Sequence, residues 1–186
     1  SIIDGLPQGS TIEIPIEIVA LNLRSVPGGT LGGEVITFDA QLRLPMTGTG
    51  SLAGFARDIP MQGMGEIHTA PRTPGSSLQG FDTDMRQLQG QLPIGDPDFD
   101  LLRITAGTGF GMPSPGHTTL TSRSSSNDWS VDSFFDITYR IDFVGHPGTP
   151  LGGHSGSTTG TIRVYQGCPN WLPGYEYKMH YPQPPD

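Results

Sequence analysis

Residues 132–143 decide the fold, and they read Asp132-Ser133-Phe134-Phe135-Asp136-Ile137-Thr138-Tyr139-Arg140-Ile141-Asp142-Phe143. From Phe135 onward every second residue is aromatic or aliphatic, and the residues between them are aspartate, threonine or arginine. Because successive side chains of a strand point to opposite faces, this alternation predicts a strand with one buried face and one solvated face. Strands of that kind are typical of antiparallel sheets.

Two earlier stretches alternate in the same way. Residues 36–46 carry apolar side chains at the even positions and mostly polar ones at the odd positions. Residues 11–23 begin with the same parity and change it near Val19, which predicts a β-bulge or a strand that crosses between sheets. Pro15 lies within this run and cannot donate to a ladder, so we expect it at a sheet edge or an irregularity.

The remaining strands are predicted from shorter apolar runs separated by glycine, proline, serine and threonine. The chain contains 27 glycines and 18 prolines, which mark turns between strands. Met85–Leu88 favours one helical turn instead. We expect an all-β fold, an antiparallel β-sandwich of jelly-roll or Ig-like type with long Gly/Pro-rich loops. The other expected strands are 52–59, 63–68, 102–106, 117–121 and 158–165.

Composition and charge narrow the class of partner. The formal net charge is −8 and Lys178 is the single lysine, so no basic stripe is available to neutralise a phosphate backbone. We therefore expect no nucleic-acid partner, and the lack of a long apolar run predicts no membrane span. A chain that begins with Ser1 and has this composition suggests a secreted protein whose signal peptide has been removed. Cys168 is the only cysteine, which leaves a thiol or a link to another chain.

Three carboxylates at alternate positions, Asp96, Asp98 and Asp100, form the one candidate metal site. On an extended segment they point the same way and could hold calcium, which prefers oxygen ligands. The glycine and the distal glutamate of an EF-hand loop are missing, and solvated aspartates that discourage edge-to-edge pairing explain the pattern equally well. We expect no other cofactor.

Other groups match catalytic sites less closely. Residues 153–157 (Gly-His-Ser-Gly-Ser) miss the spacing of a serine-nucleophile elbow. His146 and His154 have no short spacing that would favour a shared metal. Asp132 and Asp136 fall on one strand face at a separation of roughly 13 Å, too far for a glycosidase pair. We therefore expect no catalytic residue and no enzyme.

The chain is expected to form one β-sandwich domain over residues 1–166, followed by an extended aromatic and proline-rich tail, residues 167–186. Aromatic side chains of this kind either bind protein surfaces or stack on sugar rings. We favour protein contacts, because a proline-rich extended segment needs a surface to order it. The expected partner-binding residues are Pro15, Ile16, Trp171, Tyr175, Tyr177 and Tyr181.

Four segments together resemble a group of secreted bacterial β-sandwich proteins without an assigned activity. The most distinctive is the Asp-Ser-Phe-Phe-Asp element. The resemblance implies an extracellular location and supplies no catalytic residue. The segments are 95–100, 113–120, 131–137 and 156–162.

These observations predict a non-enzymatic extracellular structural or assembly subunit of a bacterial surface layer, filament or larger complex. We expect a homo-oligomer or polymer, or a subunit of a larger protein complex, built by adding a strand to a neighbour. The alternative is a carbohydrate- or calcium-dependent binding module. A hydrolase acting through His154 and Ser155 is the third hypothesis.

Overall fold

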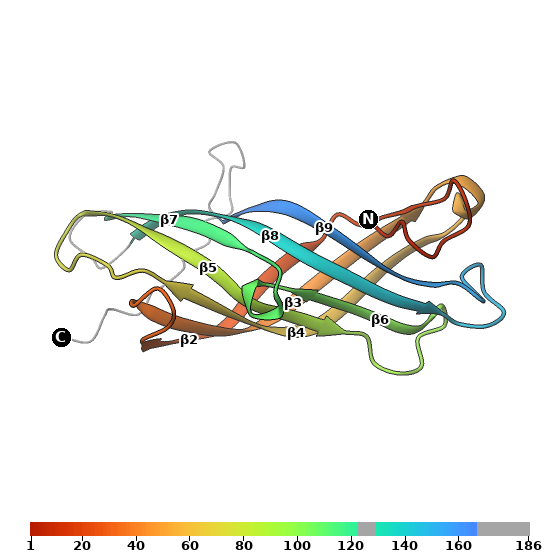
Figure 1. Ribbon diagram of the computed structural model, residues 1–186, viewed down its shortest axis with the longest axis horizontal. Helices are drawn as coiled ribbons and strands as arrows, with labels where there is room; N and C mark the ends of the chain where they lie inside the picture. Colours follow the sequence, from red (N-terminus) through yellow and green to blue (C-terminus); the bar gives the residue numbers. More distant parts are fainter. Residues whose placement is uncertain (123–128, 167–186) are drawn as a thin grey trace.

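The computed structural model describes residues 1–122 and 129–166, which contain strands and two short 3-10 helices (Figure 1). The prediction of an all-β, antiparallel chain is confirmed. The 3-10 helices are η1 (Gly50–Leu52) and η2 (Thr108–Phe110). The strands are β1 (Ile12–Glu13), β2 (Glu17–Pro27), β3 (Glu34–Gly48), β4 (Ala56–Thr69), β5 (Leu78–Gln91), β6 (Phe99–Ala106), β7 (Pro115–Ser122), β8 (Trp129–Gly145) and β9 (Ser155–Gln166).

All these strands belong to one hydrogen-bonded sheet in which every pairing joins strands that are next, or next but one, along the chain. β3 pairs with β1 and β2 along one edge and with β4 along the other, and β4 continues to β5. At the far end of the sheet, β8 pairs with β9. The hydrogen bonds do not divide the strands into two sheets, so a sandwich of jelly-roll or Ig-like type is not confirmed.

In the middle of the sheet, the strand pairings close into a small ring. β6 and β7 both pair with β5 and both pair with β8. β6 lies beside the later part of each of these strands, and β7 lies beside the earlier part. Because both are antiparallel to β5, β6 and β7 run in the same direction and behave as one long strand interrupted by residues 107–114.

The core lies on one face of this rolled sheet. Phe135, Ile137, Tyr139, Ile141 and Phe143 of β8 are buried, as the alternation predicts. The even-numbered apolar residues of β3 are buried as well, and most of them join the β8 residues in a single hydrophobic cluster. Two strands far apart in sheet order therefore face each other across the core, and the molecule is elongated along its long strands (Figure 1).

The predicted helical turn at Met85–Leu88 is wrong, because these residues belong to β5. Glu66 of β4 is opposite Gln87, whereas Ile67 is opposite Met85, so Arg86 is an extra residue in β5. A bulge of this kind shifts the alternation by one residue. It places two buried side chains three residues apart, which is also the spacing of a helix face.

Two other expectations concern the N-terminal half. The bulge predicted near Val19 exists, but it lies between Leu21 and Arg24 of β2. Pro15 falls in the break between β1 and β2, as its missing N–H predicts. The separate strands expected at 52–59 and 63–68 form one strand, β4, preceded by η1.

Candidate functional site

The first candidate site lies along the outer edges of β2 and β9, which face each other across the core. We call this site the seam. Within residues 1–122 and 129–166, β2 pairs only with β3, and β9 pairs only with β8. Ile16, next to β2, Ile18 of β2 and Ile162 of β9 line one small cavity of about 10 Å³. The two edges therefore enclose the same interior space without pairing to each other.

The seam is apolar on its inner side. Ile16, Ile18, Ala20 and Leu23 are partly buried and pack against the core cluster, as do Ile162 and Val164 of β9. In the centre of the sheet, the corresponding residues are almost fully buried. The difference indicates that side chains along the seam have less cover than those of β3 or β8.

Residues 2–5 close one end of the seam. Ile2 and Ile12 exchange backbone hydrogen bonds of 2.8 and 3.0 Å. The backbone N–H groups of Ile3 and Asp4 both donate to Oγ1 of Thr158 at 3.0 Å. The N-terminal segment therefore connects β1 to the beginning of β9.

This N-terminal contact is close enough to require glycine. A Cβ atom on Gly156 would lie 2.0 Å from the carbonyl oxygen of Asp4. On the other side of the contact, Gly5 has a φ of +85° and its Cβ would lie 2.0 Å from the carbonyl oxygen of Ser155. The two glycines allow backbone to pack directly on backbone.

Apolar side chains are exposed on the outer faces of both edge strands. Val19, Leu21 and Val26 of β2 are exposed, and Tyr165 of β9 is 71% exposed. Exposed edges with apolar side chains are the surfaces that soluble proteins usually blunt, because they can pair with another strand. The combination makes the seam a candidate protein-binding site.

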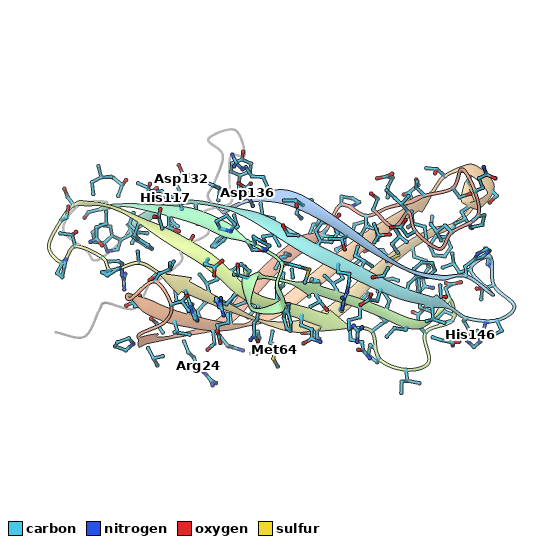
Figure 2. The ribbon with its side chains drawn as sticks, viewed as in Figure 1. Arg24, Met64, His117, Asp132, Asp136 and His146 are labelled. Carbon is cyan, nitrogen blue, oxygen red and sulfur yellow. The ribbon has the colours of Figure 1, made fainter. Side chains whose placement is uncertain are left out.

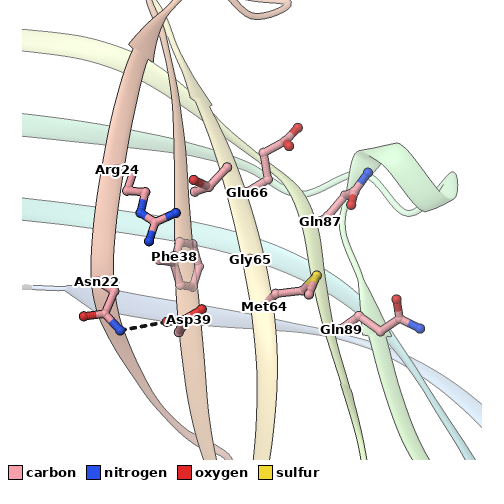
Figure 3. Close-up of a pocket in the computed structure, with 10 residues that line it drawn as sticks. Asn22, Arg24, Phe38, Asp39, Met64, Gly65, Glu66, Gln87 and Gln89 are labelled. Carbon is pink, nitrogen blue, oxygen red and sulfur yellow. Dashed lines mark hydrogen bonds between the residues drawn. The ribbon is translucent and has the colours of Figure 1, made fainter.

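The second candidate site is a shallow depression of about 250 Å³ on the outer face of the sheet (Figure 3). It is crossed by β2, β3, β4 and β5, and its lining is largely polar. Met64 stands among these polar groups and is 68% exposed. Figure 2 shows Arg24 and Met64 on a different side of the molecule from Asp132 and Asp136. The polar lining residues are Asn22, Arg24, Thr37, Asp39, Glu66, Gln87 and Gln89.

Two β-bulges shape this depression. The bulge of β2 contains Asn22, whose φ of +53° is the only positive value at a non-glycine residue in the described part of the chain. Asparagine tolerates this conformation better than most residues. Its side-chain Nδ2 donates to Oδ2 of Asp39 at 2.7 Å. The second bulge, at Glu66 and Arg86, lies on the opposite side of the depression.

The aspartates predicted to hold calcium are divided between two partners. Arg57 pairs with Asp96, through a 2.9 Å bond from Nη2, and with Asp98. Burial alone would lower the pKa of Arg57, but the hydrogen bonds and charges of Asp96 and Asp98 outweigh it and raise this pKa. Asp100 instead contacts Nδ1 of His146 at 2.7 Å. Calcium binding here stays a prediction, and it would compete with Arg57.

Two of the side chains that resemble catalytic groups, Ser157 and Asp136, have structural partners. Ser157 lies in β9 and its hydroxyl donates to Asp142 at 2.6 Å. Asp136 pairs with Arg163, whose hydrogen bonds hold the pKa of this carboxyl below its usual value. Asp132 is exposed on the same strand. His146 lies at one end of the molecule, far from both aspartates (Figure 2).

The predicted partner-binding residues are only partly covered by the structure. Pro15 is exposed and Ile16 is half-buried at the seam. Trp171, Tyr175, Tyr177 and Tyr181, like Cys168, lie outside the described residues. Their role stays a prediction.

Sequence reasoning missed the depression. The available signals are the outward pair Gln87 and Gln89 and the asparagine at the β2 bulge. Neither signal indicates a binding site by itself, because only the register of β2 to β5 brings these residues together.

Comparison with protein-family models, with curated proteins and with solved structures finds no match for this chain. In the part of the chain that the structure describes, no helix has the length and apolar character needed to cross a bilayer. The same residues contain no cluster of three or more His, Cys, Asp or Glu side chains with the geometry of a metal site.

Proposed function

We propose that the protein is a non-enzymatic extracellular assembly subunit, part of a bacterial surface layer, filament or larger complex, and that its seam binds a second copy. The observation that carries this proposal is the pair of edge strands, β2 and β9, which pair on one side only among the described residues. A strand contributed by a neighbour would satisfy these edges and cover the partly buried side chains beneath them.

The two edges belong to different strands, so a contact between them is heterologous. The β2 edge of one copy would meet the β9 edge of the next, and such contacts continue into a polymer unless the rotation closes a ring. Val19 and Leu21 on one edge and Tyr165 on the other supply apolar side chains that gain burial in this contact. Part of the same proposal is that Trp171 and the nearby tyrosines add to the interface.

The proposal includes two further expectations from the sequence. An extracellular location fits the acidic composition and the resemblance to secreted bacterial proteins. A two-layer, sandwich-like packing of the rolled sheet is supported by the shared buried cluster of β3 and β8.

Sedimentation velocity of the full chain at increasing concentration tests the assembly function. We expect the wild-type protein to form larger species in a concentration-dependent manner. The double variant Val19→Lys/Leu21→Lys should remain monomeric, because charges on an edge strand oppose strand addition. Val144→Lys is the control, since Val144 is similarly exposed and apolar but lies on β8, where it is paired on both sides, with β6 and β9.

Two results would count against the proposal. The first is a wild-type protein that stays monomeric at the highest concentration. The second is a Val19→Lys/Leu21→Lys variant that assembles as well as Val144→Lys. The triple variant Tyr175→Ser/Tyr177→Ser/Tyr181→Ser then shows whether the C-terminal tyrosines take part in the interface.

The alternative function, a carbohydrate- or calcium-dependent binding module, is favoured by one observation, the polar depression on β2 to β5. This surface and the seam involve different residues. One chain can therefore assemble through the seam and also bind a ligand in the depression.

A further inference from the structure

We propose that the depression on the outer face of β2 to β5 is a binding site for a neutral saccharide. Its polar side chains come from opposite sides and surround one shallow hollow (Figure 3). Arg24 approaches from β2, Glu66 rises from β4, and Gln87 and Gln89 extend from β5. A sugar ring placed in the hollow would meet groups from four strands at once.

The hydrogen-bonding groups around the hollow are suited to hydroxyl groups. Arg24, Gln87 and Gln89 make no side-chain hydrogen bond to another described residue, so their N–H and C=O groups can bind a ligand. Asp39 uses Oδ2 for Asn22, which leaves Oδ1 as an acceptor. A hydroxyl both donates and accepts, and this mixture of amide, guanidinium and carboxylate groups satisfies both requirements.

The carboxylate of Glu66 is held in place by His68. The backbone N–H of Thr30 donates to Nδ1 of His68 at 3.0 Å, so the ring proton is on Nε2. Nε2 then donates to Oε1 of Glu66 at 2.9 Å. Because His68 is buried, Glu66 is fixed with Oε2 left to accept from a ligand.

Charge selects against anionic ligands. Two carboxylates, Asp39 and Glu66, and one guanidinium, Arg24, line the hollow. A phosphate, a sulfate or an acidic sugar would gain from Arg24 but would be repelled by both carboxylates. A neutral polyhydroxylated ligand meets no such repulsion and can use every polar group.

Shape and preorganisation fit the same ligand class. Met64 presents an exposed, polarizable surface on which the C–H face of a sugar ring can pack. Arg24 and Glu66 lie on strands β2 and β4, next to the two bulges, rather than on loops. Asp39 and Glu66, which are already held by Asn22 and His68, therefore lose little side-chain freedom on binding.

Affinity electrophoresis tests the proposal, with native gels of the full chain run in dextran, laminarin, xylan or mannan as neutral probes and alginate as the anionic probe. We expect at least one neutral polysaccharide to retard the wild-type protein. The variant Gln87→Ala/Gln89→Ala should bind it about tenfold more weakly, because neutral hydrogen bonds to the ligand are lost.

The control variant is Gln41→Ala/Gln62→Ala. These two glutamines are also exposed on neighbouring strands, β3 and β4, but they do not line the hollow. This variant should bind as the wild type does. The proposal is overturned if no neutral probe retards the protein, if alginate alone does, or if the two double variants bind equally well.

Discussion

Replacing Gly156 by alanine should detach the N-terminal segment from β9. The new Cβ would lie 2.0 Å from the carbonyl oxygen of Asp4 and 2.6 Å from its carbonyl carbon. Both atoms are backbone, so no side-chain rotation can relieve the clash, and residues 2–5 must move. The two hydrogen bonds to Thr158 and the burial of Ile2, which is fully enclosed, depend on this contact.

The expected decrease in stability can be estimated from the interactions that residues 2–5 lose. Two hydrogen bonds contribute about 1–3 kcal/mol together, and full burial of one isoleucine contributes about 1.5–3 kcal/mol. Because the segment can repack in part, we expect the free energy of unfolding to fall by about 2–4 kcal/mol. For a domain of this size that corresponds to a decrease in Tm of roughly 5–15 °C.

Urea denaturation and thermal melting followed by circular dichroism measure this change. Gly54→Ala is the control, because Gly54 is exposed and a Cβ there meets nothing within 4 Å. This variant should stay within about 0.5 kcal/mol of the wild type. Equal stability of Gly156→Ala and Gly54→Ala would refute the packing of residues 2–5 on β9.

Two other substitutions test the charged groups. Asp142 accepts hydrogen bonds from Ser157 and Arg103; burial raises the pKa of Asp142, but these bonds and the charge of Arg140 outweigh it and lower the pKa. The contribution of Asp142 to stability is therefore complete above the unfolded pKa of about 3.9 and is lost as pH falls through the folded pKa. In urea titrations, Asp142→Asn should lower the free energy of unfolding by about 1–3 kcal/mol at neutral pH and approach the wild type in acid. A variant and a wild type whose stabilities change with pH in parallel would contradict this prediction. Arg57→Ala leaves Asp96 and Asp98 without their cation, so Tm should fall and millimolar calcium should recover part of the loss. A wild-type Tm that rises equally with calcium would instead support the calcium-dependent alternative.

The long strands could be predicted because their alternation is not interrupted. Phe135 to Phe143 and the even positions of 36–46 bury the side chains that the pattern places inward. The prediction of a helical turn at Met85–Leu88 is wrong because one extra residue, Arg86, produces a spacing that a strand with a bulge shares with a helix. Local periodicity identifies a strand, and it fails where the strand is irregular.

The candidate sites depend on pairings that local sequence does not contain. Asp96 and Asp98 share Arg57, which is about forty residues earlier in the chain. The depression requires residues of β2, β3, β4 and β5 in a particular register, including two irregularities. The sequence alone identifies the aspartates and the glutamines. It does not identify the charged residue or the strand that lies next to them in the fold.

The contact between Ile3 and Thr158 joins residues 155 positions apart, whereas each strand pairing joins strands that are next, or next but one, along the chain. Successive hairpins can form early because each closes a short loop, but this last junction requires almost the whole polypeptide to be in place. It should therefore form late in folding and open first in native-state fluctuations. Each such opening would transiently uncover the beginning of β9, which residues 2–5 otherwise cover, and give an incoming strand a place to begin pairing.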